Sequence, residues 1–162
     1  MVESLLQISK DRNHYTNHGP LVSKLEDYFR DILKIEDSKS VILAGNGSAA
    51  LHAIGHGMNR NLGKKLKWAT QSYSFPSSVQ GPFEGTTIVD IDPIDFTLDI
   101  SLLKGNEDGI IVTNLFGLVS DIEKYENWAK SNGKLLIFDN ATVPMTFYKG
   151  KNSLNCGNAT FL

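Results

Sequence analysis

Two short segments of this chain are almost continuously apolar, and they constrain its fold more than any other feature. They read Gly-Ile-Ile-Val-Thr over residues 109–113 and Leu-Leu-Ile-Phe-Asp over residues 135–139. A strand with one solvated face alternates apolar and polar residues, so unbroken runs are typical of strands buried on both faces of a parallel sheet. Parallel strands need long connections, usually helices. The two segments therefore predict an α/β domain.

Strand and helix patterns alternate along the rest of the chain. Apolar spacing and capping residues predict helices over residues 21–33, 48–58 and 122–131, the last one capped by Asp121 and closed at Asn132-Gly133. Residues before Gly19 are rich in turn formers, and we expect them to be irregular. Strands are predicted over residues 40–43, 67–70, 86–90, 109–113, 134–139 and 159–162. This order predicts a mostly parallel sheet with helices on both faces.

Composition narrows the class of protein. The 162 residues are enough for one domain with a substantial core, and the net charge of -2 comes without a basic stripe. Nucleic acid and anionic membranes are therefore not expected as partners. The start lacks the pattern of a secretory signal, and no apolar run approaches the length of a membrane span. A lone cysteine, Cys156, excludes an internal disulfide and favours a reducing, cytoplasmic location.

Asn46-Gly47-Ser48 lies between a predicted strand and a predicted helix. Backbone N–H groups at a helix N-terminus, together with a hydroxyl, favour an anion such as phosphate. Gly47 permits close approach of the backbone to a ligand. The alternative is that Ser48 serves only as an N-cap.

Asp139 ends an apolar strand, where ligands collect in open α/β sheets. A carboxylate there can keep a pyridinium nitrogen protonated, and the alternative is a helix cap or a structural ion pair. Tyr73 and Phe75 follow an earlier strand in the loop Ser-Tyr-Ser-Phe-Pro. An aromatic face in this loop can stack on a flat heteroaromatic ring, and the alternative is that both rings pack in the core.

Three further groups are weaker candidates. His52 and His56 share a helix face, but without a third ligand we expect a packed or solvated pair rather than a metal site. Asp90 and Asp92 offer two carboxylates for acid/base work, although loop capping is the favoured interpretation. Cys156 sits in an Asn/Gly-rich turn with no activating base beside it in sequence, so we expect a small packed residue rather than a nucleophile.

Seven motifs, in order and at family spacing, resemble the DegT/DnrJ/EryC1/StrS family of pyridoxal-phosphate (PLP)-dependent sugar aminotransferases. They begin at Thr16, Asn46, Ser72, Val89, Asn114, Asp139 and Gly157, and read TNHGPLV, NGSAALH, SYSF, VDIDP, NLFG, DNA and GNATF. The resemblance implies a truncated fold-type-I large domain over residues 21–162, preceded by an N-terminal arm over residues 1–20.

The resemblance also assigns roles around PLP. Gly47, Ser48 and Ala49 hold its phosphate, Phe75 stacks on the pyridine ring, and Asp139 pairs with the ring nitrogen. Thr142 falls near the ring hydroxyl, where the family usually has Gln or His, and its side chain has a shorter reach. Asn114 replaces a common His and Asn140 a common Ala, so substrate and reaction are open on these grounds.

The Schiff-base lysine of the family follows the Ala-Thr-Phe strand, and the sequence ends at Leu162 before that position. We therefore assign no catalytic residue and expect weak PLP binding and no turnover by this chain alone. Lys149 and Lys151 precede the strand, in an expected surface turn. The implied substrates are a nucleotide-linked keto sugar and an amino donor, with a homodimer or larger assembly. The alternatives are a PLP-dependent sugar dehydratase relative and a non-catalytic binding or dimerising module.

Overall fold

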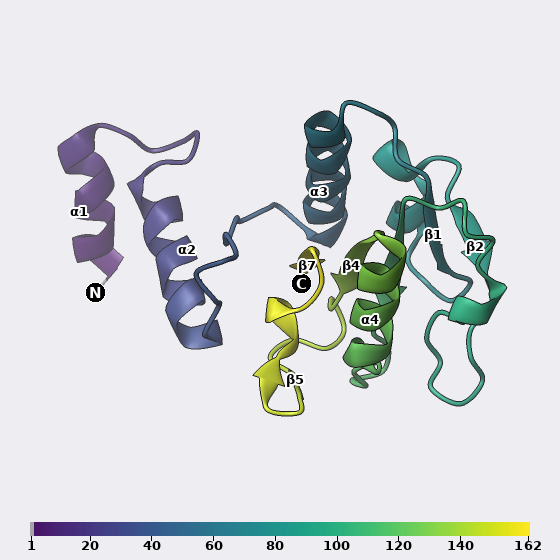
Figure 1. Ribbon diagram of the computed structural model, residues 1–162. Helices are drawn as coiled ribbons and strands as arrows, with labels where there is room; N and C mark the ends of the chain where they lie inside the picture. Colours follow the sequence, from purple (N-terminus) through teal and green to yellow (C-terminus); the bar gives the residue numbers. More distant parts are fainter. Residues whose placement is uncertain (1) are drawn as a thin grey trace. The chain divides into compact units, whose positions relative to one another are not determined.

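The computed structural model describes residues 2–162, which form two compact units, one ending at Leu43 and one beginning at Ala44. The first unit contains the helices α1 (Val2–Arg12) and α2 (Pro20–Leu33) (Figure 1). Proline at the first position of α2 suits a helix start, and Lys34 ends the helix in the left-handed conformation. The helix predicted over residues 21–33 is therefore confirmed.

Helix α1 corrects the expectation that everything before Gly19 is irregular. Only residues 13–19 between the two helices lack helical structure. The apolar pattern of α1 is weak, because Leu5 and Leu6 are exposed and the residue that it buries is Ser9. Helix α1 has no amphipathic stripe, but it packs against α2, and such tertiary contact stabilises a short helix.

Residues 40–43 form no strand, which corrects a second prediction. Side chains of α2 bind the backbone of this segment and of the residue before it. Glu26, which is buried, accepts a hydrogen bond of 2.9 Å from the Leu43 N–H, and Arg30 donates one of 2.8 Å to the Lys39 carbonyl. The apolar character of this segment did not lead to burial, since Ile42 is 77% exposed.

The second unit is built on a five-stranded sheet in the order β2-β1-β3-β4-β7, and every pairing is parallel. Its strands are β1 (Trp68–Gln71), β2 (Thr87–Val89), β3 (Gly109–Thr113), β4 (Leu135–Asp139) and β7 (Ala159–Phe161). These five predicted strands are confirmed to within one residue at each end. The mostly parallel α/β class is confirmed with them.

Helices α3 (Gly47–Leu62) and α4 (Ile122–Asn132) cover opposite faces of this sheet (Figure 1). Asn46 and Asp121 cap their N-termini through side-chain oxygens, and Gly63 and Gly133 end them at positive φ. Helix α3 runs beyond the predicted end at residue 58. Gly55 fits inside it because a Cβ there would lie 2.6 Å from the Phe83 ring.

The central strands are buried on both faces, as their composition predicts. Ile110 and Val112 of β3 pack on the α4 side, while Ile111 between them packs on the α3 side. In β4, Leu136 and Phe138 face α4 and Ile137 faces α3. Two separate apolar clusters therefore fix both helices to the sheet.

A two-stranded hairpin, β5 (Phe147–Tyr148) and β6 (Lys151–Asn152), comes after β4 and before β7 in the chain and forms a separate small sheet. Its two turn residues, Lys149 and Gly150, both have positive φ, as a type I′ turn requires. The surface turn expected around Lys149 is therefore confirmed. Among the described residues, none of the helices has the length and apolar character needed to cross a membrane.

Candidate functional site

Asp139 and Phe161 lie side by side at the carboxyl edge of the sheet. Asp139 ends β4 opposite Thr113 of β3 on one side and Phe161 of β7 on the other. The backbone continues this contact, because the Asn140 N–H donates to the Phe161 carbonyl over 2.9 Å. This edge is the place where parallel α/β sheets bind ligands.

The Asp139 side chain is only 5% exposed, and burial raises the pKa of its carboxyl above the ordinary value of 3.8. Two weaker influences act in the opposite direction. The Ala141 N–H donates to Oδ1 over 3.0 Å and the Thr113 hydroxyl donates to Oδ2 over 3.4 Å. Such hydrogen bonds stabilise the ionised form, whereas desolvation favours the protonated one. The hydrogen bonds hold the carboxyl in place, but none of the described residues forms an ion pair with it.

The N-terminus of α3 reaches the same edge through β7 (Figure 1). A Cβ built on Gly47 would lie 3.5 Å from the Phe161 ring, so the first turn of the helix packs against the strand residue that pairs with Asp139. Asn46 Oδ1 accepts the Ala49 N–H over 2.9 Å, and the Asn46 carbonyl accepts the Ala50 N–H. The N–H groups of Gly47 and Ser48 have no partner among the described residues, and helix geometry gives them none.

Tyr73 and Phe75 do not belong to the core, being 56% and 64% exposed. Phe75 immediately precedes the short 3-10 turn η1 (Pro76–Val79), and the Ser78 hydroxyl donates to its carbonyl over 2.8 Å. The Ser74 hydroxyl lies 2.8 Å from that of Thr113, the neighbour of Asp139. The aromatic loop is thereby tied to the edge where Asp139 lies.

A buried amide network beneath this edge escaped the sequence prediction. Asn114 donates through Nδ2 to Asn140 Oδ1 over 2.6 Å, and Asn140 donates to the Thr160 hydroxyl over 2.7 Å. Asn114 also accepts the Ser120 N–H, and the Thr142 hydroxyl donates to the Asn114 carbonyl over 2.8 Å. Both asparagines are fully buried. The sequence contains one indication of this network, because both asparagines depart from the family pattern and two substitutions at neighbouring strand ends can compensate each other.

The weaker candidates serve local structure. The His52 ring approaches the Ser77 carbonyl at 3.2 Å and packs beneath Gly81, while His56 is exposed. Asp90 and Asp92 accept backbone N–H groups from Ile91 and Ile94, which agrees with loop capping. Cys156 is buried in the cluster on the α4 side of the sheet. Within residues 2–162, no cluster of three or more His, Cys, Asp or Glu residues is placed to hold a metal ion.

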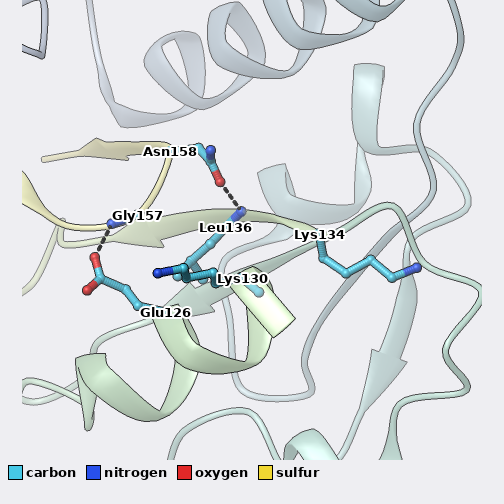
Figure 2. Close-up of a pocket in the computed structure, with 7 residues that line it drawn as sticks. Glu126, Lys130, Lys134, Leu136, Gly157 and Asn158 are labelled. Carbon is cyan, nitrogen blue, oxygen red and sulfur yellow. Dashed lines mark hydrogen bonds between the residues drawn. The ribbon is translucent and has the colours of Figure 1, made fainter. Parts of the chain in front are cut away.

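A cavity of about 310 Å³ lies away from these residues, beside the C-terminal half of α4 (Figure 2). Its lining includes Glu126, which accepts the Gly157 N–H over 3.0 Å, and Asn158, which accepts the Leu136 N–H over 2.8 Å. Lys134 extends away from both and bonds to backbone carbonyls. None of the predicted site residues contributes to this cavity.

The strand-end residues offer complementary chemistry. Two amides at a helix N-terminus that have no partner among the described residues favour an anion. An exposed aromatic ring offers a stacking face, and a buried carboxyl can accept from a ring N–H. A flat heteroaromatic ring with a phosphate arm carries matching groups. The groups present at this edge therefore fit the cofactor that the sequence leads us to expect, PLP.

Solved structures share this fold. DesI in the presence of its TDP-sugar product matches with a TM-score of 0.78 at 20% identity, over 98% of this chain and 41% of that chain. The E. coli GDP-4-keto-6-deoxy-D-mannose-3-dehydratase with bound hydrated PLP matches with a TM-score of 0.75 at 16% identity, over 96% and 42%. The fold is thus that of a large domain of fold type I, present in part.

Among curated proteins, the GDP-perosamine synthase of Caulobacter vibrioides is 27% identical over 158 residues. The alignment covers 93% of this chain but only 42% of that relative, so the chain spans less than half its length. The model of the DegT/DnrJ/EryC1/StrS aminotransferase family matches residues 3–162. The chain therefore belongs to the DegT/DnrJ/EryC1/StrS aminotransferase family.

Proposed function

We propose that this chain supplies the cofactor-binding face of a PLP-dependent aminotransferase acting on a nucleotide-linked keto sugar, with glutamate as amino donor. The observation that carries the proposal is the position of Phe161, which contacts Gly47 and pairs with Asp139. The free amides of α3 and the buried acid therefore share one edge of the sheet. Family membership supports the cofactor and the substrate class.

The phosphate is assigned to the first turn of α3. The N–H groups of Gly47 and Ser48 and the Ser48 hydroxyl are the donors without a partner among the described residues. The Ala49 N–H is already donated to Asn46 Oδ1, so Ala49 could contribute to the phosphate only by sharing this N–H. The positive end of the helix dipole adds to the attraction. Because Gly47 lies against the Phe161 ring, the phosphate is held close to β7 rather than out in solvent.

The ring is assigned to Phe75, Asp139 and Thr142. Phe75 would cover one ring face, and Asp139 in its ionised form would accept the ring N–H, which would offset the desolvation that raises the carboxyl pKa. The Thr142 oxygen would remain as an acceptor for the ring hydroxyl, since the Thr142 proton is donated to the Asn114 carbonyl. When bound, PLP acts as an electron sink for bonds at the amino-bearing carbon.

We further propose that this chain alone binds PLP reversibly and does not turn over. The Lys149 amine pairs with Glu123 over 2.6 Å in the surface hairpin, which argues against a covalent role there. The full active site is expected to need a homodimer or larger assembly, because large exposed apolar side chains lie at the strand ends. A cytoplasmic location is consistent with the single free cysteine.

PLP titration of the purified chain, followed by absorbance and equilibrium dialysis, tests the proposal. We expect saturable binding that Asp139→Asn weakens by about tenfold, the equivalent of one charge-assisted hydrogen bond. Asp27→Asn, which removes an exposed carboxylate from α2, is the matched control and is expected to bind like the parent. Equal affinity of the Asp139→Asn variant and the parent chain would exclude the assigned ring position.

Borohydride treatment of the PLP complex tests the absence of a Schiff-base lysine. Reduction fixes any lysine-bound PLP, so mass spectrometry reads covalent attachment directly. We expect no site to be labelled stoichiometrically, and we expect Lys149→Ala to bind PLP as the parent does. Stoichiometric labelling of one lysine would show that this chain carries its own covalent anchor.

A further inference from the structure

Three hydroxyl groups form a continuous row between the aromatic loop and the carboxyl of Asp139. Ser78 Oγ lies 2.8 Å from the Phe75 carbonyl and 3.3 Å from Ser74 Oγ. Ser74 Oγ lies 2.8 Å from Thr113 Oγ1, which lies 3.4 Å from Asp139 Oδ2. Ser78 is 3% exposed and Thr113 is 4% exposed, so the row is largely removed from water.

Counting protons fixes the direction of the row when Asp139 is ionised. Each hydroxyl has one proton to donate, and the carboxylate only accepts. Thr113 then donates to Asp139, Ser74 donates to Thr113, and Ser78 donates to the Phe75 carbonyl. The contact between Ser74 and Ser78 is left with no proton in it.

The protonated acid permits a different arrangement. Asp139 donates to Thr113, Thr113 donates to Ser74, Ser74 donates to Ser78, and Ser78 donates to the Phe75 carbonyl. Every contact of the row now contains one proton, and all hydroxyls point toward the loop. The row therefore has two directions, and the charge on Asp139 selects between them.

We propose that this hydroxyl row couples the charge state of Asp139 to the loop carrying Phe75, with Thr113 as the positioning residue of the carboxyl. In the ionised direction Ser74 stays bonded to Thr113, but the Ser74–Ser78 contact contains no proton, which loosens the start of the loop from the turn that follows Phe75. In the protonated direction the row is complete, and Ser74 is bonded to both Thr113 and Ser78. The functional meaning rests on the proposed function, since Phe75 and Asp139 are the assigned contacts of the PLP ring.

No other charged side chain is needed for this coupling. The influences on the Asp139 pKa are burial, the Ala141 N–H and the Thr113 hydroxyl, and none of these is an ionisable group. Asp90, which follows β2, accepts from the Ser72 hydroxyl and from the Ile91 N–H instead. Phe161, opposite Asp139 on β7, is apolar. Titration of Asp139 is therefore the event that reverses the row.

Nuclear magnetic resonance of the chain without PLP tests the coupling. The Asp139 carboxyl carbon and the Ser74 and Ser78 amides are followed across pH, and all three are expected to titrate with one midpoint. Thr113→Val is expected to raise the Asp139 midpoint, because a donor to the charged form is lost, and to abolish the response of both amides. Thr113→Ser keeps the hydroxyl and is expected to restore both features.

Ser74→Ala interrupts the row between Thr113 and Ser78, and it replaces Thr113→Val as the test if that variant does not fold. In Ser74→Ala, Asp139 is expected to titrate with the midpoint of the parent chain, while the Ser78 amide no longer responds. Thr87→Val, a half-buried threonine of the edge strand β2, is the matched control and is expected to leave all three titrations unchanged. Ser74 and Ser78 amides that still follow Asp139 in Thr113→Val, or that never respond in the parent chain, would overturn the proposal.

These results are independent of PLP titration. A parent chain that binds PLP but shows no shared midpoint refutes the coupling and leaves the proposed function intact. A shared midpoint in a chain that fails to bind PLP refutes the proposed function and retains the coupling. In the chain that passes both tests, Thr113→Val is also expected to weaken PLP binding, whereas Thr113→Ser is not.

Discussion

Asp139 is buried without compensation by a described cation, so it is expected to reduce the stability of the chain at neutral pH. Its pKa in the folded chain lies above the ordinary value of 3.8, so the folded state holds this proton more tightly than the unfolded state. The free energy of unfolding therefore falls as pH rises from about the unfolded value to the folded one, and the loss remains at higher pH. Packing alone therefore does not account for an acid at this position.

Asp139→Asn is the corresponding prediction. The amide keeps an acceptor for the Ala141 N–H and has no charge to bury. We expect the variant to be the more stable protein at pH 7, with an advantage that shrinks as pH falls through the folded pKa of the parent. Urea unfolding of both proteins across pH measures this difference. Parallel stability curves over that range would show that burial of Asp139 has no energetic cost.

Asn140→Ala tests the buried amide network. The change removes both the acceptor of Asn114 Nδ2 and the donor to the Thr160 hydroxyl. Leaving a buried polar group unpaired costs about 1–3 kcal/mol, so we expect a loss of that order or more in unfolding free energy. In a double-mutant cycle with Asn114→Ala, the combined loss is expected to be smaller than the sum of the single losses. Strict additivity would contradict a shared network.

At the scale of elements, two glycines of α3 make opposite predictions. A Cβ at Gly55 would lie 2.6 Å from the Phe83 ring, whereas at Gly57 nothing lies within 4 Å. Gly55→Ala is therefore expected to cost about 1–3 kcal/mol through overpacking. Gly57→Ala is the matched control and is expected to add about 0.5–1 kcal/mol, as alanine does in an open helix position. Thermal unfolding followed by circular dichroism distinguishes the two; equal shifts would contradict the packing of α3 against Phe83.

Sequence patterns predicted the elements whose own residues carry the information. The runs at β3 and β4 are apolar on both faces, and Asp121 and Gly133 bound α4 by capping chemistry. Segments decided by tertiary contacts were predicted wrongly. Residues 40–43 have a strand-like composition, but Glu26 of α2 accepts the Leu43 N–H, and Arg30 of α2 binds the Lys39 carbonyl just before them. Helix α1 lacks an apolar stripe and lies against α2.

The candidate site divides in the same way. Local rules identified Gly47 at a helix start and Asp139 at a strand end, because each depends on a few neighbouring residues. The hydrogen bond from the Ala49 N–H to Asn46 Oδ1 depends on the rotamer of the Asn46 side chain, which the sequence does not specify. The hydroxyl row from Ser78 to Asp139 joins residues far apart in the chain. Such contacts appear only when the sheet register is known.

At the scale of the whole molecule, we expect self-association through the strand-end loops. Phe116 and Leu118, which follow β3, are 67% and 58% exposed, and exposed apolar groups of this size mark interaction surfaces. Phe116→Ser combined with Leu118→Ser is expected to shift the chain toward monomer at micromolar concentration. Light scattering measures the mass. Leu62→Ser, an exposed leucine at the other end of α3, is the control; equal effects of both changes would contradict a specific surface.

The division at Leu43 gives the molecule a built-in pair of optical probes. Both tryptophans, Trp68 and Trp128, lie after it, so indole emission reports only on the unit beginning at Ala44. Far-ultraviolet ellipticity also reports on the helices α1 and α2 of the unit that ends at Leu43. A melt whose two traces coincide means that the units unfold cooperatively, whereas an earlier loss of ellipticity means that the leading helices unfold as an independent module.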